Sequence, residues 1–569
     1  MKVSFRFPAT LASEATRAIR RRSLLLAVVG IAVLPLAWRG PSCGQDFDFH
    51  LQNWLEMARS WQEGVLYPHW SASANYLAGE PRYIFYPPLS RLLGGALGCV
   101  LPWAWTALAF TLATLLGAGF AFRAMAREWA GDDNAAVAAC LYVVNPYMMF
   151  LVYERGALAE LLAAVWMPLL VLYGLRRGKS LVPLALTIAA LWLTNAPAGV
   201  MGCYALAAIA LVAVVERRSW TLVGRAAGAV VLGLGLAGFW LLPAIYEQRW
   251  VQIDRAIGPL MRVRDSFLFG FVRTAGTPAD ETFELRYHNH ILGMASWIVV
   301  ALMLATLVAG WVAWRRKSAV WLPLAICGVA ICALQLRGSE AIWRHAPEMA
   351  FLQFPWRWML VLGVICAAMV GLAMGPNAPT RRTLARRAVA MLLLAGGMAV
   401  LSSVMFWQVC DDEDNVQAQR ATLRTAGFDG TDEYTPRGAD NVDADADLPQ
   451  VQIRTAVSSG QTIAARVTIG RWQAEHMTAT VTSPAAGFAV LRLMDYPAWS
   501  VTENGMAVQG RPRTDDGLMA VPVAAGVNQI DVRWRTTRDQ WAGIWMSLAA
   551  LAITLAVSWA DRRKTRTAP

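Results

Sequence analysis

Long apolar runs alternate with short polar connections over most of this chain. Each run is close to the length that a helix needs to cross about 30 Å of hydrocarbon. Several are short, which gives their count a margin of one or two. We therefore predict a polytopic α-helical membrane protein with about twelve transmembrane helices. The runs lie at 23–38, 103–122, 135–150, 161–175, 181–195, 198–215, 223–243, 291–313, 319–335, 358–375, 388–407 and 541–560.

A different pattern occupies the region between the last two apolar runs. Polar and apolar residues alternate singly there, between Gly, Pro and Ser, as is typical of half-buried strands. The rhythm continues to Trp534. We expect a small β-sandwich-like domain of about seven or eight short strands. Its default role is scaffolding, and contact with carbohydrate or another substrate is the alternative. The clearest strand segments are 450–457, 462–469, 476–483 and 488–493.

Three parts follow from these patterns. The first, 1–408, is a transmembrane domain with external insertions at 39–87, 244–290 and 336–357. The second, 409–538, is external and β-rich. The third, 539–569, holds the final transmembrane helix and a basic cytoplasmic tail. Residues 88–101 are short enough to form an extra juxtamembrane or re-entrant helix.

Basic residues gather in every second connection. Because Lys and Arg in short loops are retained on the cytoplasmic side, both termini are expected to be cytoplasmic, with 409–538 outside. The expected location is the bacterial cytoplasmic (inner) membrane. The basic clusters are Arg17–Arg22, Arg123 with Arg127, Arg176–Lys179, Arg217 with Arg218, Arg315–Lys317, Arg381–Arg387 and Arg562–Arg566.

Composition supports the membrane interpretation. The 569 residues are 56% hydrophobic and only 16% charged, and the mean hydropathy of +0.40 is too high for soluble domains. The net charge of +12 could indicate nucleic-acid binding, but the alternating basic clusters account for it, so no nucleic-acid partner is expected. Ala37-Trp38-Arg39 offers no small-residue cleavage site, and the first run is read as a retained helix.

The cysteines and histidines give weaker signals. The eight cysteines show no metal-ligand spacing, and six lie in or beside apolar runs. Cys43 and Cys410 both follow predicted spans on the outside, where a disulfide between them and two unrelated free thiols are equally compatible with the sequence. His288 and His290 are two apart and could chelate a metal from a strand, although surface histidines ahead of a span are more usual. The acidic segment 411–447 lacks a calcium-loop pattern and reads as a linker.

The first external insertion holds the densest set of chemistry-bearing residues. Asp46 and His50 are four apart and share one face if a helix begins there. A carboxylate oriented by an imidazole could accept a proton from an acceptor hydroxyl. The alternative is that Asp46 caps that helix. Asp48 would point elsewhere, and Tyr86-Pro87-Pro88 gives a rigid extended lead-in to the next helix.

Several motifs together resemble a bacterial multispanning family labelled "6-pyruvoyl-tetrahydropterin synthase-related". Nothing in the chain matches the zinc-binding pattern of the soluble synthase. In its layout the family is similar to the GT-C glycosyltransferases, which carry a catalytic acid in the loop after the first helix and use polyprenyl-linked sugars. The motifs are GQDFDFH at 44–50, GVLYPHW at 64–70, GEPRYIFYPPL at 79–89, NPY at 145–147, YERGALAE at 153–160, QFPWR at 353–357 and GTDEYTP at 430–436.

The resemblance implies roles for particular residues. Asp46 matches the loop acid and is expected to be the general base, with His50 as its companion and Glu160 as a further catalytic candidate. Arg155 and Arg357 would bind phosphate, because guanidinium groups suit it. Interfacial snorkelling of these arginines, and stabilisation of a helix N-terminus by Glu160, stay open as alternatives. The remaining candidates for substrate binding are Asp48, Trp70, Tyr86 and Glu433.

These expectations combine into one predicted function. The protein would be an integral membrane glycosyltransferase that moves a sugar from a polyprenyl-phosphate donor to an extracytoplasmic glycan, lipid or protein acceptor. Membrane lipids would be its other partners. No nucleotide cofactor is implied, since no P-loop or dinucleotide fingerprint is present; the need for a divalent cation stays open. The alternative is a non-catalytic membrane scaffold or a glycolipid-binding or export factor in envelope polysaccharide assembly.

Overall fold

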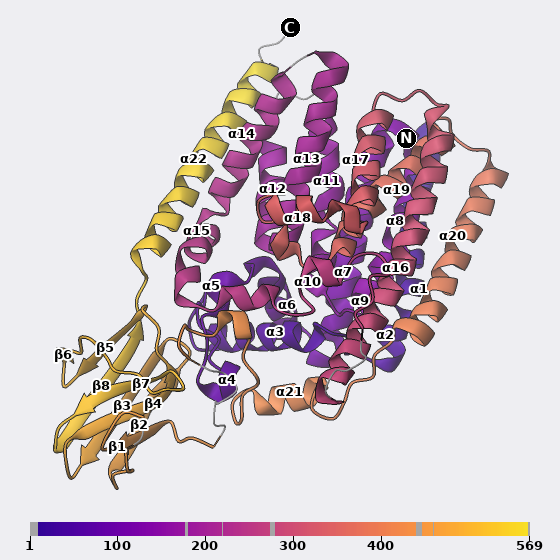
Figure 1. Cartoon of the computed structure of the whole chain (residues 1–569). Coiled ribbons are helices and arrows are strands. Elements are labelled where there is room, and N and C mark those ends of the chain that lie inside the picture. The colour runs from indigo at the N-terminus through magenta and orange to yellow at the C-terminus, as the bar shows by residue number, and fades with distance from the viewer. Residues whose placement is uncertain are drawn as a thin grey trace, which may run out of the picture.

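The computed structural model describes residues 9–176, 180–218, 220–273, 279–439, 447–458 and 460–566. A bundle of long helices makes up most of the molecule, and a β sandwich sits at one end of it (Figure 1). This confirms the predicted polytopic helical protein with a C-terminal β-rich part. Arg177, Lys179 and the acidic residues at 440–446 lie outside the described residues.

Each predicted apolar run coincides with helix. The short helix α2 continues α1 after a break, and three pairs, α8 with α9, α14 with α15 and α17 with α18, bend by 41°, 78° and 98°. The helices are α1 Ala9–Ala32, α2 Leu34–Arg39, α7 Trp103–Ala130, α8 Asp132–Val143, α9 Pro146–Tyr153, α10 Leu158–Ala163, α11 Trp166–Leu175, α12 Val182–Thr194, α13 Ala196–Arg217, α14 Thr221–Leu236, α15 Gly238–Glu247, α16 Ala279–Trp314, α17 Trp321–Leu334, α18 Glu340–His345, α19 Met359–Met374, α20 Arg381–Leu401 and α22 Arg538–Arg566.

The number of membrane crossings depends on whether each bent pair of helices crosses as one span. Over the described ranges, seven helices are long and apolar enough to cross a membrane, and the bent pairs raise this to at most ten. The predicted twelve also includes α1 with α2 and the 13-residue α12. The bend between α8 and α9 has a local cause, since Pro146 lacks an N–H and the Asn145 side chain caps the new helix by accepting from Tyr147 and Met148.

Short helices form a layer across one end of the bundle. They are α3 Phe47–Gln62, α4 Ala74–Leu77, α5 Arg82–Phe85 and α6 Pro88–Val100. In Figure 1, α3 and α6 lie across the long helices rather than along them. Helix α6 is the extra short helix expected at 88–101, and it packs closely on α3 because Gly94 leaves room for the Trp54 ring. This layer places the candidate site at the end of the bundle nearest the sandwich.

The C-terminal domain is a two-sheet antiparallel sandwich. Its sheets have the strand orders β1-β4-β7 and β2-β3-β8-β5-β6. The expected strand at 462–469 begins four residues later, because the pairing of β2 with β3 starts at Arg466. The strands are β1 Val451–Arg454, β2 Arg466–Gln473, β3 His476–Ser483, β4 Gly487–Met494, β5 Trp499–Glu503, β6 Met506–Ala507, β7 Leu518–Val523 and β8 Gly526–Trp534.

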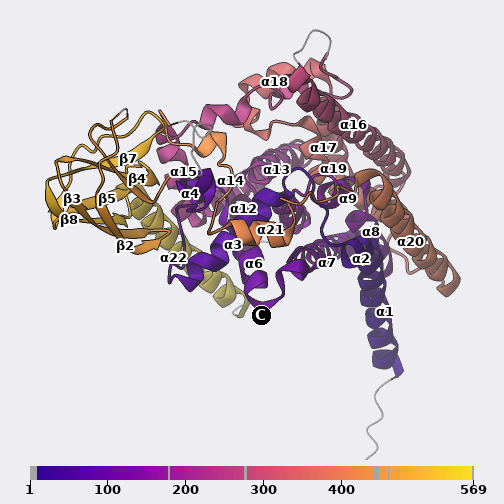
Figure 2. The same ribbon diagram turned by 90° about the horizontal axis from the view of Figure 1, so that it is seen from below.

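The segment between α20 and the sandwich contacts the first external insertion. It contains α21 Val416–Thr422 and the 3-10 turn η8 Asp432–Tyr434. The Ser73 hydroxyl donates to the carbonyl oxygen of Leu423 at 2.7 Å, and the Thr431 N–H donates to Glu80 at 2.8 Å. Helix α4 lies beside the sandwich in Figures 1 and 2. The first insertion is therefore enclosed by this segment and the sandwich.

Both chain ends lie at the end of the bundle opposite to the sandwich (Figure 1). Basic clusters meet at that end: Arg21 pairs with Asp133 at 2.5 Å, and Arg387 donates to Asn134 at 2.5 Å. The termini and these clusters thus share one face of the molecule. Assignment of that face to the cytoplasm stays a prediction from the basic residues.

Candidate functional site

Two segments far apart in sequence run side by side at the start of α3. The Gln45 and Asp46 N–H groups donate to the carbonyl oxygens of Glu154 and Arg155, at 3.2 and 2.7 Å. A Cβ on Gly44 would lie 2.3 Å from the Glu154 carbonyl oxygen. Gly156 has φ +58, and a Cβ there would lie 2.8 Å from the Phe47 backbone nitrogen. Glycine at both places permits this approach. The motifs that contain GQD and ERG therefore meet at this point.

Asp46 forms an ion pair with Arg155. Its Oδ2 lies 2.8 Å from the Arg155 Nη2, and the two side chains are 33% and 2% exposed. Asp46 does occupy the N-cap position of α3, but its side chain makes no capping hydrogen bond. The carboxylate is therefore directed at the buried guanidinium, which itself comes from the break between α9 and α10.

A second ion pair lies behind the first. Glu160 is buried and accepts a 2.5 Å hydrogen bond from the Tyr147 hydroxyl, while the Arg357 Nε lies 3.5 Å from its other oxygen. The guanidinium groups of Arg155 and Arg357 lie 5.4 and 5.2 Å from the Phe354 ring centre. Two cations and two carboxylates thus lie close to one aromatic ring. Glu160 is also in the first turn of α10, as stabilisation of that helix N-terminus would require.

Some donors in this group have no protein partner. The Nε and Nη1 of Arg155 are buried without a hydrogen bond, while the Nε of Arg357 has only its 3.5 Å ion pair with Glu160. Buried donors of charged groups are costly to leave unsatisfied. These N–H groups are therefore suited to an anionic ligand, and the site contains more guanidinium donors than the protein itself uses.

His50 packs beneath Asp46 on the first turn of α3. It is 3% exposed, and the Ala159 N–H donates to its Nε2 at 3.4 Å. Burial lowers the pKa of His50 to about 4, which outweighs the raising effect of Asp46; Arg155 lowers it further. His50 is neutral at physiological pH and is suited to hold α3 against α10. We name Asp46, His50, Arg155, Glu160 and Arg357 the Asp46 cluster.

Two further predicted residues border the Asp46 cluster. Burial raises the pKa of the Tyr86 hydroxyl, and Asp46 adds to that rise while Arg357 opposes it. The Tyr86 ring lies 6.2 Å from the His50 ring. Asp48 accepts from the Phe49 N–H at 2.7 Å, and burial raises its pKa, with Asp414 the largest neighbouring charge. The hydrogen bond of Asp48 is therefore to its own helix and not to Arg155.

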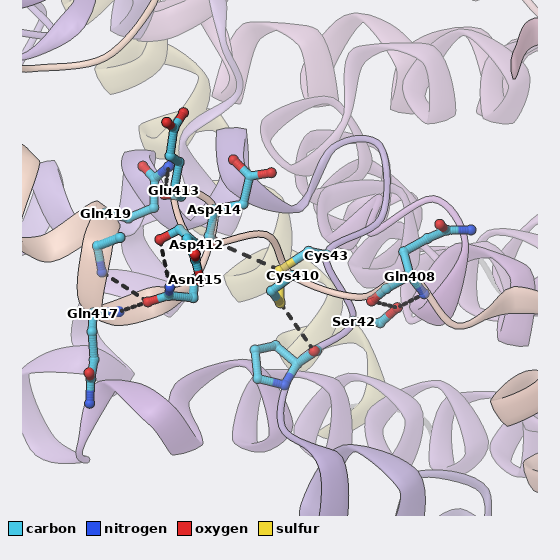
Figure 3. The surroundings of a disulfide bond; sticks show 12 residues. Ser42, Cys43, Gln408, Cys410, Asp412, Glu413, Asp414, Asn415, Gln417 and Gln419 are labelled. Atoms are coloured by element: carbon cyan, nitrogen blue, oxygen red, sulfur yellow. Dashed lines mark hydrogen bonds between the residues drawn. A yellow bond between two sulfur atoms is a disulfide. The ribbon is translucent and has the colours of Figure 1, made fainter.

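A disulfide holds the start of α3 in place. Cys43 and Cys410 are bonded with their α-carbons 4.9 Å apart (Figure 3). Beside the disulfide, the Ser42 hydroxyl accepts from the Gln408 N–H at 2.9 Å, and the Gln408 side chain donates to both oxygens of Glu154 at 3.0 and 2.9 Å. Burial raises the pKa of Glu154 to about 7. The covalent link thus fixes the segment that carries Asp46.

The structure also shows a buried polar cluster to which the sequence analysis gave no role. Glu56 accepts from Tyr83 at 2.7 Å, from the Ser73 N–H at 2.6 Å and from the Ser71 hydroxyl. Glu80 pairs with Arg82 at 2.6 Å, and both side chains are at most 1% exposed. In the sequence, the charged residues of the EPRY segment at 80–83 were the one sign of this cluster. Such fully partnered charges organise the insertion.

Trp70 and Glu433 lie apart from the Asp46 cluster. The Trp70 ring is 1% exposed and packs 5.2 to 6.0 Å from those of Trp499, Trp534 and Tyr496. It therefore anchors the sandwich to the first insertion. Glu433 is half-buried in η8, and burial raises its pKa to about 7, with Glu80 adding to the rise. Both remain only proposals as substrate contacts.

A metal site from the histidine pair is not supported by its geometry. His288 and His290 lie in helix α16, not in a strand, because that helix begins at Ala279, well ahead of the apolar run at 291–313. Two residues apart on a helix point to different sides. His288 Nε2 lies 2.9 Å from the Asp265 carbonyl oxygen. Within the described ranges, no three His, Cys, Asp or Glu side chains are placed to share a metal ion.

Several solved structures are similar to the chain at low sequence identity. Among solved structures, the chain is similar to ArnT from Cupriavidus metallidurans bound to undecaprenyl phosphate, with 15% identity over 73% of this chain and 69% of that one and a TM-score of 0.43. It is similar to the arabinofuranosyltransferase AftD from Mycobacteria, with 15% identity over 72% and 32% and a TM-score of 0.43. For the Archaeoglobus fulgidus oligosaccharyltransferase with zinc and sulfate the values are 14%, 68%, 54% and 0.39.

No curated protein sequence matches the chain. A family model, described as "6-pyruvoyl-tetrahydropterin synthase related domain; membrane protein", matches residues 83–409. The matched range is more than half of the 569 residues and includes every long helix from α7 to α20. The chain therefore belongs to the 6-pyruvoyl-tetrahydropterin synthase related family of membrane proteins.

Proposed function

We propose that the protein is a membrane glycosyltransferase that takes a sugar from a polyprenyl-phosphate donor and transfers it to an acceptor on the sandwich side of the membrane. The observation that carries this proposal is the Asp46–Arg155 pair. It combines a carboxylate that is 33% exposed with a guanidinium that is 2% exposed and keeps unpartnered donors. A proton acceptor and a phosphate-binding cation at a membrane surface are what such a transfer needs.

Asp46 acts as the general base in this proposal. It accepts the proton of an acceptor hydroxyl while that oxygen attacks the anomeric carbon of the donor sugar. The bond from this carbon to the phosphate oxygen breaks, and the polyprenyl phosphate leaves with the bonding electrons. His50 is neutral and buried, so it positions α3 and does not take part in proton transfer.

The two arginines have different roles in this proposal. In a direct displacement with inversion, the base and the leaving group lie on opposite sides of the sugar. Arg155 is bonded to the base at 2.8 Å and therefore belongs to the base side. Arg357 is held by Glu160 at 3.5 Å and is the cation that we assign to the leaving phosphate.

Transfer by the purified protein tests the proposal. The protein would be reconstituted in lipid nanodiscs with a panel of undecaprenyl-phosphate hexoses, pentoses and aminohexoses and with soluble glycan acceptors. Asp46→Asn keeps the shape of the side chain and its contact with Arg155 but removes the base. We expect transfer to fall by roughly 100-fold or more, with donor binding retained.

Asp48→Asn is the matched control, because Asp48 lies two residues away in the first turn of α3 and accepts from the Phe49 N–H, whereas Asp46 pairs with Arg155. Its effect should be much smaller. Full activity of Asp46→Asn would contradict the assignment of Asp46 as the general base. Absence of transfer by the wild type with every donor in the panel would favour a non-catalytic scaffold or glycolipid-binding role.

A further inference from the structure

A cavity of about 280 Å³ lies between the first external insertion and the β sandwich. It is separate from the Asp46 cluster. Its walls come from the end of α3, the segment after α21, and strands β2 and β4. The lining side chains that matter here are Arg59, Glu63, Arg424, Gln450, Trp472 and Arg492.

The lining carries three guanidinium groups and one carboxylate. The carboxylate of Glu63 is fully engaged: one oxygen accepts from Arg59 at 2.8 Å and the other from the Ala474 N–H at 3.0 Å. Arg59 also donates to the Ser73 hydroxyl at 3.1 Å. Glu63 therefore braces α3 against the turn between β2 and β3, and the excess charge of the lining is positive.

An aromatic side chain completes the lining. Trp472 is half-buried and lies where the pairing of β2 with β3 shifts register. Bulges of this kind re-aim side chains next to binding sites. An indole offers an apolar face to the C–H groups of a sugar ring, while guanidinium groups bind carboxylate or phosphate with paired hydrogen bonds. The two together are suited to an acidic saccharide.

The size and position of the cavity agree with one part of a longer ligand. Its volume is close to the lower end of ordinary ligand sites, about 300 Å³, which suits a saccharide unit or two. Asp46 precedes the first residue of α3 and Arg59 lies in its last turn. A rise of 1.5 Å per residue therefore puts them about 20 Å apart along the helix. A ligand that reached both places would have to be a chain of sugars.

We propose that this cavity binds an anionic saccharide unit of the acceptor, several units from the point of transfer. The identification of the ligand as the acceptor rests on the proposed function; the binding site itself does not. The protein would then select acidic glycans over neutral ones through Arg424, Arg59 and Trp472. Carboxylate and phosphate groups share this chemistry.

Calorimetry on the nanodisc-reconstituted full chain tests the site without any need for turnover. The probes are an oligogalacturonate, a phosphorylated oligosaccharide and a neutral maltooligosaccharide of equal length. We expect both acidic probes to bind at least about tenfold more tightly than the neutral one. Arg424→Gln and Trp472→Leu should each weaken acidic binding by about tenfold. Arg424 is exposed, so its replacement is not expected to disturb folding.

Arg420→Gln is the matched control, since Arg420 is also exposed, lies in α21 and is not part of the cavity lining. It should bind like the wild type. Asp46→Asn should also keep acidic binding, which separates this site from the proposed chemistry. Equal affinity for neutral and acidic probes, acidic binding that ignores Arg424 and Trp472, or binding only when the nanodiscs contain anionic lipid would each overturn the proposal.

Discussion

At the scale of single residues, Asp46 has two roles: it pairs with the buried guanidinium of Arg155, and it is the proposed general base. A guanidinium that is 2% exposed requires a nearby anion, and Asp46, which is 33% exposed, supplies one at 2.8 Å. Asp46 is thus important for folding as well as for the proposed proton transfer. Replacement by Asn rather than Ala keeps a hydrogen-bond acceptor for Arg155, and this makes the activity of the variant interpretable.

His50 gives a prediction for the pH dependence of stability. Its pKa is lowered from 6.5 to about 4 in the folded protein. The unfolded chain therefore binds more protons between these values, and the free energy of unfolding falls as pH falls from 6.5 towards 4. At pH 5 the loss from this one group is about 2 kcal/mol. Thermal unfolding of the wild type and His50→Gln at pH 7 and pH 5 measures it.

The difference between the two pH values should be smaller in His50→Gln than in the wild type. His290→Gln serves as the control because His290 is exposed on α16, and it should keep the wild-type difference. An unchanged pH difference in His50→Gln would mean that His50 titrates alike in the folded and unfolded chains.

At the scale of elements, the start of α3 is fixed by contacts from three distant segments. Residues 42–46 hydrogen-bond to Gln408 and to 153–155, and the Cys43–Cys410 disulfide adds a covalent link across 367 residues. Gly44 and Gly156 allow the backbones to approach. The position of Asp46 is therefore set by the junction of these segments and not by α3 alone.

The disulfide predicts a joint loss of stability and activity. In protein matured in its own envelope, peptide mapping without reductant should recover Cys43 linked to Cys410. The double variant Cys43→Ser with Cys410→Ser should unfold about 2–4 kcal/mol more easily, and transfer should fall because Asp46 loses its support. Cys99→Ser is the control, since Cys99 is free and exposed. Alkylation of both thiols without reductant would contradict the link.

At the scale of the whole molecule, the two ends of the bundle differ in kind. One end holds both termini and the pairing of Arg21 and Arg387 with α8. The other holds α3, α5, α6 and the sandwich. A single helix, α22, connects the sandwich to the C-terminal end. This polarity is what a membrane enzyme with an external site and basic internal loops requires.

Reporter fusions test that polarity. A fusion at residue 430 should read the external side, and one after residue 569 should read the cytoplasm, because only α22 lies between the sandwich and the C-terminus. A fusion in the connection after α20, truncated before the sandwich, should match the first. A cytoplasmic reading at 430 would reverse the orientation and place the Asp46 cluster on the wrong side for an external acceptor.

The sequence alone determined the helices, most strands and the family. Transfer of an apolar run into hydrocarbon and alternation along a strand are local properties, so the runs at 103–122 and 291–313 and the strand at 476–483 were predicted from their own residues. Asp46, Arg155, Glu160 and Arg357 were also chosen from motifs. Their residue types and places near span ends were sufficient to nominate them.

Only the tertiary structure decided how those residues are used. The Asp46 side chain contacts Arg155, 109 residues away, instead of capping α3. Trp70 was nominated with the others but packs between the insertion and the sandwich. The number of crossings depends on how three helix pairs bend. Each outcome is set by packing between segments that are distant in sequence, where burial and pairing of charge outweigh local preference.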